Sequence, residues 1–131
     1  MPTHSQPSPG AFWAGAIISV LVILFLVFDG VTKIIKVKPV LDASMQLGIP
    51  ESRVVGIGIL LLACTALYAV PTTAVLGAIL LTGYLGAAVA IHVRAGSGTF
   101  PVIFSLMFGV LTWFGLILRE PRLLWTILMR Q

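Results

Sequence analysis

Residues 54–93 read VVGIGILLLACTALYAVPTTAVLGAILLTGYLGAAVAIHV, and this stretch contains no aspartate, glutamate, lysine or arginine. It is too long for one membrane-spanning helix and long enough for two, because a span needs about 20 apolar residues. Its turn signal is Val70-Pro71-Thr72-Thr73, so we predict one span over residues 54–69 and the next over 72–92. A connection this short makes the two helices an antiparallel pair.

The segment before this pair predicts one more span and a surface helix. Residues 11–28 are uninterrupted apolar sequence, and their polar continuation to residue 36 completes the length of a span. Lys38-Pro39 ends that helix, since the residue before proline is pushed away from the α region. Residues 39–47 then predict a short helix on the membrane surface, with Gly48 as its C-terminal cap.

The two ends of the chain complete the predicted organisation. Residues 99–118 form a fourth apolar run, and residues 121–130 predict a short interfacial tail. Residues 1–10 are rich in proline and serine and predict a disordered leader. We therefore expect an all-α membrane protein, with four spans in an antiparallel bundle making a single domain over residues 11–131.

Composition places the protein in a lipid bilayer. Hydrophobic residues make up 59% of the chain and charged residues 9%, a balance that cannot cover a surface in water. The net charge of +4 therefore bears on membrane orientation, and no basic run indicates nucleic-acid binding. Lys33, Lys36, Lys38, Arg53 and Arg94 outnumber the arginines after the fourth span, which favours a cytoplasmic position for this group. We expect a multi-pass protein of the inner or plasma membrane.

Few residues could hold a metal or an internal cofactor. The chain has one cysteine, Cys64, and two histidines, His4 and His92. This set allows no internal disulfide, no cysteine metal cage and no haem held by two histidines of the bundle. We predict no metal and no cofactor within the chain, and we assign no catalytic residue.

The third span carries a periodic row of small side chains. Small residues recur every four positions, which places them on one face of the helix. In lipid such a face favours close helix packing, inside the bundle or in a homo-oligomer. The same glycines could instead make room for a flat ligand against the backbone. The row consists of Ala74, Ala78, Thr82, Gly86 and Ala90.

Charged and polar residues gather at the ends of the odd-numbered spans. Asp29 and Lys33 are four residues apart, a spacing that pairs an acid with a base. His92 closes the third span, and the four-span topology puts it at the membrane depth of Asp29. The three residues could form one interhelical cluster, or each could be solvated separately at the interface. Arg94 is a candidate contact to lipid phosphate.

Two aromatic residues within the spans are candidates for lining a ligand cavity. Tyr84 and Trp113 each carry one hydrogen-bonding group on an apolar body. Aromatic side chains at mid-span otherwise belong to the core or to the lipid-facing surface.

Several blocks of the sequence together resemble the DoxX-like family of small four-span membrane proteins. The blocks are Phe28-Asp29-Gly30-x-x-Lys33, Leu47-Gly48-x-Pro50, Leu67-Tyr68-x-x-Pro71-x-Thr73-Ala74, Leu81-Thr82-Gly83-Tyr84-Leu85-Gly86 with the following His92-x-Arg94-x-Gly96, and Trp113-x-Gly115-Leu116-x-Leu118-Arg119-x-Pro121-Arg122. The resemblance implies a fold and a membrane location. It marks Asp29, Lys33, Tyr84, His92 and Arg94 as motif positions to which it attaches no role.

These observations leave three hypotheses for function. The first is a noncatalytic accessory or binding subunit for an apolar ligand, a quinone or a lipid. The second is a component of a quinone-linked membrane oxidoreductase, in which His92 and Asp29 handle protons and a membrane redox partner supplies electrons. The third is an assembly factor for other membrane proteins. We do not expect the isolated chain to be an enzyme.

Overall fold

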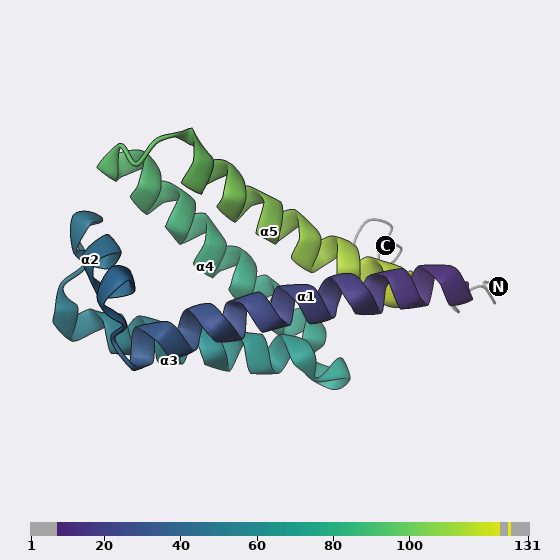
Figure 1. Ribbon diagram of the computed structural model, residues 1–131. Helices are drawn as coiled ribbons and strands as arrows, with labels where there is room; N and C mark the ends of the chain where they lie inside the picture. The colour runs from purple at the N-terminus through teal and green to yellow at the C-terminus, as the bar shows by residue number, and fades with distance from the viewer. Residues whose placement is uncertain (1–7, 124–125, 127–131) are drawn as a thin grey trace.

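The computed structural model describes residues 8–123 and 126, and within them it contains five α-helices and one short 3-10 helix (Figure 1). Four segments of this described part are long and apolar enough to cross a membrane: α1, α3, α5 and the continuous segment of η1 and α4. The predicted spans and the short helix after the first are therefore confirmed. The elements are α1 (Pro9–Ile34), α2 (Lys38–Gln46), α3 (Glu51–Ala69), η1 (Pro71–Thr73), α4 (Ala74–Ala95) and α5 (Thr99–Arg119).

The four spanning helices are arranged as a ring. α1 packs against α3 and α5, and α4 packs against the same two helices. The short helix α2 lies at one end of this bundle, which we call the α2 end, and α1 begins and α5 ends at the other, which we call the Arg119 end (Figure 1). Large apolar side chains such as Trp13, Phe28 and Val110 are exposed on the outer faces, as lipid contact requires.

The first helix begins inside the stretch that the sequence predicts as a leader. The Ser8 hydroxyl accepts a hydrogen bond from the Ala11 backbone nitrogen at 3.1 Å, and Pro9 occupies the first helical turn. Serine as N-cap with proline after it is a favourable helix start. Residues 1–7 and most of the predicted tail over 121–130 lie outside the described residues, so a disordered leader and an interfacial tail stay predictions.

Glycines set the closest approaches between α1 and its two neighbours. A Cβ atom added at Gly15 would lie 2.7 Å from the carbonyl oxygen of Gly115 on α5. One added at Gly58 on α3 would lie 2.7 Å from the carbonyl oxygen of Gly30. Neither distance admits a side chain, so α1 meets both helices backbone against backbone. In lipid such close packing holds helices together, because apolar side chains gain little by leaving an apolar solvent.

One hydrogen-bonded tyrosine joins three helices within the apolar core. Tyr68 on α3 is fully buried. Its hydroxyl donates to the carbonyl oxygen of Thr112 on α5 at 2.6 Å and lies 3.2 Å from the Ser19 hydroxyl on α1. Because a buried hydroxyl needs a partner, this arrangement fixes the relative positions of the three helices. The surrounding core includes Val22, Leu26, Leu61, Ala78, Leu81 and Leu116.

Candidate functional site

Asp29 and Lys33 form an ion pair near the α2 end of the first helix. The Lys33 Nζ atom lies 2.6 Å from a carboxylate oxygen of Asp29. The Lys33 side chain is 15% exposed and the Asp29 side chain 32% exposed, so the pair is partly buried. The spacing of four residues in the sequence therefore corresponds to a contact within α1. Lys33 also packs where α1 meets α3, because a Cβ atom added at Gly58 on α3 would lie 2.9 Å from the Cβ atom of Lys33.

His92 lies at the same end of the bundle but bonds to neither of these residues. It is in the last turns of α4, and α4 and α1 both end at the α2 end. Its Nδ1 atom is buried and has no hydrogen-bond partner among the described residues. The described hydrogen bonds of Asp29 and Lys33 also do not involve His92. Asp29 and His92 thus lie at the same end of the bundle, while their shared membrane depth and an interhelical polar cluster stay predictions.

The remaining motif residues of α4 lie apart from one another. Tyr84 is half-buried against the core, and Arg94 is exposed. Arg94 makes no salt bridge within the described part of the chain, which leaves its predicted contact with lipid phosphate open.

The row of small residues on α4 divides between two environments. Ala74 and Ala78 are buried, whereas Thr82, Gly86 and Ala90 are exposed. The residues of α4 that pack inside the bundle are Ala74, Gly77, Ala78, Leu81 and Leu85. Within the bundle, the buried part of the row is therefore Ala74 and Ala78, while a homo-oligomer contact or a flat ligand at the other three residues stays a prediction. A period of four drifts around a helix that turns every 3.6 residues, so the row moves from the interior onto the outer face.

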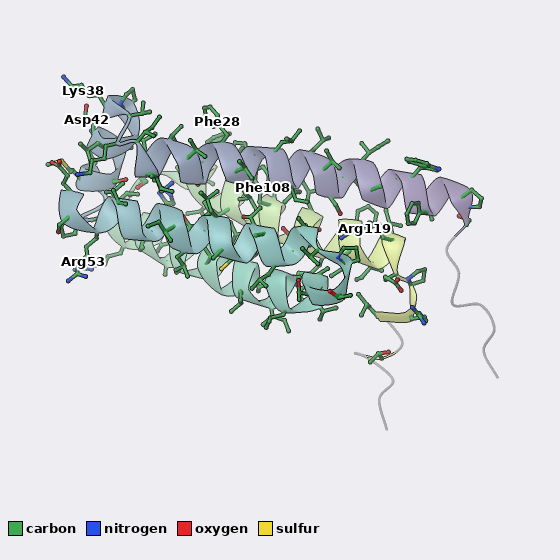
Figure 2. The ribbon with its side chains drawn as sticks, turned by 90° about the horizontal axis from the view of Figure 1, so that it is seen from below. Phe28, Lys38, Asp42, Arg53, Phe108 and Arg119 are labelled. Carbon is green, nitrogen blue, oxygen red and sulfur yellow. The ribbon has the colours of Figure 1, made fainter. Side chains whose placement is uncertain are left out.

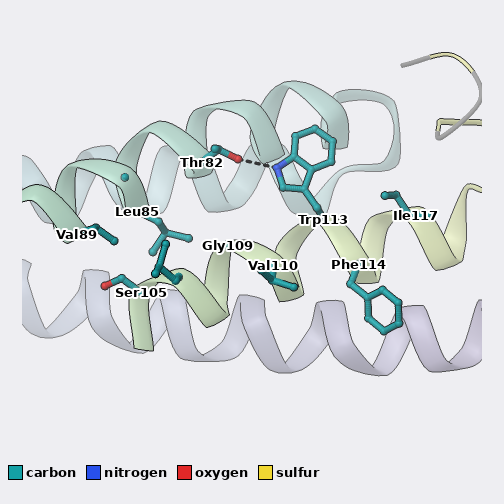
Figure 3. A pocket seen from close by; sticks show the side chains of 11 residues that line it. Thr82, Leu85, Val89, Ser105, Gly109, Val110, Trp113, Phe114 and Ile117 are labelled. Carbon is teal, nitrogen blue, oxygen red and sulfur yellow. Dashed lines mark hydrogen bonds between the residues drawn. The ribbon is translucent and has the colours of Figure 1, made fainter. Parts of the chain in front are cut away.

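A groove follows from this drift, between α4 and α5 on the outside of the bundle (Figure 3). Its volume is about 540 Å³. Gly86 and Gly109 keep it open, because no atom lies within 4 Å of a Cβ added at Gly86 and the nearest to one at Gly109 is 3.9 Å away. The lining residues are Thr82, Leu85, Gly86 and Val89 from α4, and Ser105, Leu106, Gly109, Val110, Trp113, Phe114 and Ile117 from α5.

Most of the hydrogen-bonding capacity in the groove is already used. The Trp113 indole nitrogen donates to the Thr82 hydroxyl at 2.6 Å (Figure 3). That hydroxyl in turn donates to the Ala78 carbonyl oxygen at 2.8 Å. Ser105 is the one other lining residue with a polar side chain, and within the described residues it has no hydrogen bond. The groove therefore presents an apolar surface with one small hydroxyl and no charged group.

The matched region of a family model covers most of this bundle. A model of the DoxX-like family matches residues 17–115, from α1 into α5. The chain belongs to the DoxX-like family. No curated protein and no solved structure matches it. Family membership and four apolar helices together establish a multi-pass integral membrane protein.

In this DoxX-like protein, the sequence indicated some of the groove residues and missed others. Trp113 and Tyr84 were both candidates for lining a ligand cavity. Trp113 lines the groove, whereas Tyr84 does not. Thr82 and Gly86 were assigned to packing, with space for a ligand as the alternative. Ser105 and Gly109 were missed, although they precede Trp113 at intervals of four residues and so share its helix face.

Proposed function

We propose that this DoxX-like protein is a noncatalytic binding or accessory subunit that holds a hydrocarbon chain in the groove between α4 and α5. The chain would belong to a quinone or to a lipid. The observation that carries this proposal is a groove of about 540 Å³ without a charged lining residue. Such a surface can bind and position an apolar chain, but it offers no acid, base or strong nucleophile for a reaction.

The dimensions of the groove suit an extended chain. From Ser105 to Ile117 the lining follows α5 over about 18 Å, at a rise of about 1.5 Å per residue. The volume also falls within the range of small-molecule sites, roughly 300–1,000 Å³. The Ser105 hydroxyl adds one hydrogen-bond donor, which a quinone carbonyl or a lipid ester oxygen could accept.

A hydrocarbon chain in the groove competes with the surrounding lipid, so hydrophobic expulsion from water gives it no advantage. Its advantage would come from dispersion contacts, which are individually weak and collectively large. A concave surface with Gly86 and Gly109 at its base surrounds the chain on more sides than a flat helix face does. We therefore expect the chain to exchange more slowly than bulk lipid.

No specific observation favours the other two hypotheses. A quinone-linked oxidoreductase in which Asp29 and His92 share protons would need the two side chains to communicate, and the Asp29 carboxylate is engaged by Lys33. An assembly factor would need client proteins. The copurification experiment below has one outcome that would favour each of them.

Replacing Gly86 with leucine is expected to lower the amount of ligand that copurifies with the protein about tenfold. The side chain fills the groove from α4 without a backbone clash, and a loss of about 1.4 kcal/mol in contacts corresponds to a factor of ten in affinity. Native mass spectrometry of gently extracted protein would measure the bound quinone or lipid per chain. The matched control is Gly83→Leu, three residues earlier on α4, where a Cβ atom also meets nothing within 4 Å but no groove is filled.

The ligand found on the wild-type protein and on Gly83→Leu also separates the two sources, since a quinone and a lipid differ in mass. Equal amounts of ligand on Gly83→Leu and Gly86→Leu would contradict binding in the groove. A wild-type protein without ligand that crosslinks to several membrane proteins would favour the assembly factor. A bound quinone whose reduction is lost in His92→Ala would favour the oxidoreductase.

A further inference from the structure

We propose that Arg119 anchors a second binding site, for the phosphate group of a lipid, at the Arg119 end of the bundle. This site is separate from the groove and does not depend on the proposed function. Arg119 is the last residue of α5, and it lies between the start of α1 and the end of α3 (Figure 2).

The helix contacts hold Arg119 inside the bundle. A Cβ atom added at Gly15 would lie 2.9 Å from the Arg119 backbone nitrogen, so α1 passes directly against this residue. The guanidinium extends to α3, where its central carbon lies 5.7 Å from the centre of the Tyr68 ring. A cation over an aromatic face is attracted by the ring. Tyr68 is itself fixed by its bond to Thr112, so the guanidinium has a defined position.

Two nitrogens of this guanidinium lack partners. Nε and Nη2 are both buried, and neither has a hydrogen-bond partner within the described residues. These nitrogens carry the adjacent N–H groups of one guanidinium edge, the arrangement that binds two oxygens of a carboxylate or phosphate. A buried donor on a charged group that stays unpaired is costly. An oxyanion would satisfy both donors at once.

The acidic side chains of the protein do not supply this oxyanion. The chain has four acidic residues, and Asp29, Asp42 and Glu51 all lie near the α2 end, in the last turns of α1, in α2 and at the start of α3. The fourth, Glu120, faces Arg122, whose Nη2 lies 3.1 Å and Nε 3.4 Å from a single carboxylate oxygen. Among the described side chains of the Arg119 end, Arg119 and Arg122 stand against the single carboxylate of Glu120, so positive charge is in excess there.

The position of Arg119 in the membrane indicates phosphate as the missing group. The residue ends a spanning helix, at the depth where the hydrocarbon core gives way to the headgroups. Lipid phosphates lie at that depth, and basic pockets between helices bind them. Arg94, by contrast, is exposed at the other end of the bundle.

The probe is phosphatidylglycerol added to the full chain in an uncharged detergent, with diacylglycerol of the same acyl chains as the phosphate-free control. We expect phosphatidylglycerol at saturation to raise the thermal unfolding midpoint by about 5 °C more than diacylglycerol does, because acyl-chain binding in the groove is common to both lipids. This excess is the shift that we assign to Arg119. Arg119→Gln should abolish the shift, whereas Arg122→Gln should retain it, since Arg122 already bonds to Glu120. Gly86→Leu should also retain it, which separates this site from the groove.

Inorganic phosphate alone identifies the source of the group. A shift equal to that of phosphatidylglycerol would assign the site to free phosphate, and a shift with the lipid alone would assign it to a headgroup. If Arg119→Gln does not fold, Arg119→Lys decides instead, because it keeps the charge without the two-donor edge and should bind roughly tenfold more weakly. Equal shifts with both lipids, no shift with any phosphate, or an undiminished shift in these Arg119 variants would overturn the proposal.

Discussion

Replacing Gly77 with alanine is expected to lower the free energy of unfolding by about 3 kcal/mol, at the upper end for overpacking a core. A Cβ atom at Gly77 would overlap the backbone nitrogen of Tyr68 and lie 2.5 Å from its Cα atom and 2.7 Å from the carbonyl carbon of Leu67. Backbone atoms cannot rotate away as a side chain can, so α3 and α4 must separate. That separation would also displace Tyr68, which joins α3 to α1 and α5.

The matched control is Gly86→Ala on the same helix. No atom lies within 4 Å of a Cβ at Gly86, so alanine should leave stability unchanged or raise it by up to about 1 kcal/mol, through its higher helix propensity. Denaturation by sodium dodecyl sulfate in mixed micelles would measure both. Equal stability of Gly77→Ala and Gly86→Ala would show that α3 and α4 do not meet as closely as described.

Replacing Asp29 with asparagine is expected to destabilise the bundle by about 2 kcal/mol. The change leaves the Lys33 ammonium, which is 15% exposed, without its anionic partner. Breaking a fully buried pair costs about 3–5 kcal/mol, and the 32% exposure of Asp29 reduces that value. The same micelle denaturation would measure the loss.

Two further variants separate the pair from other effects of the substitution. Asp29→Asn combined with Lys33→Met removes both charges and should recover most of the lost stability. Glu51→Gln removes one partner of an exposed pair, in which the Lys36 Nζ atom lies 3.8 Å from Glu51, and should change stability by less than about 0.5 kcal/mol. A double variant no more stable than Asp29→Asn would argue against a stabilising ion pair.

The spanning helices could be predicted from the sequence because charge and proline mark where each one ends. The uncharged run over residues 54–93 contains two spans, and Pro71 lies in the turn between them. The surface helix could be predicted in the same way, since Pro39 lies in its first turn and Gly48 follows its end. The φ of 83° at Gly48 agrees with a glycine C-terminal cap. The contact of Asp29 with Lys33 followed from their spacing of four residues.

Which face of a helix points inward could not be predicted in the same way. In water a polar face marks the outside, but both faces of α4 are apolar because lipid and core are chemically alike. Thr82 and Gly86 therefore read as packing residues and proved to be exposed. The close contacts at Gly15 and Gly77 depend on the neighbouring backbone, which a single helix pattern does not contain.

The groove combines residues of two helices, so its shape depends on how those helices are rotated. Trp113 was a candidate from its chemistry alone, and its bond to Thr82 needed the register of α5 against α4. Arg119 is a similar case. Its sequence position at the end of a span indicates an interfacial cation, whereas its place over the Tyr68 ring requires the packed bundle.

The most direct test of groove binding is the fluorescence of Trp113, which lines the groove. A Trp13→Phe/Trp125→Phe protein keeps Trp113 as its only tryptophan, and lipid or quinone analogues with brominated chains quench a tryptophan that they contact. In detergent micelles we predict quenching that saturates at one analogue per chain and is largely lost in Gly86→Leu but kept in Gly83→Leu. Quenching that rises without saturation and is equal in both leucine variants would contradict a bound chain in the groove.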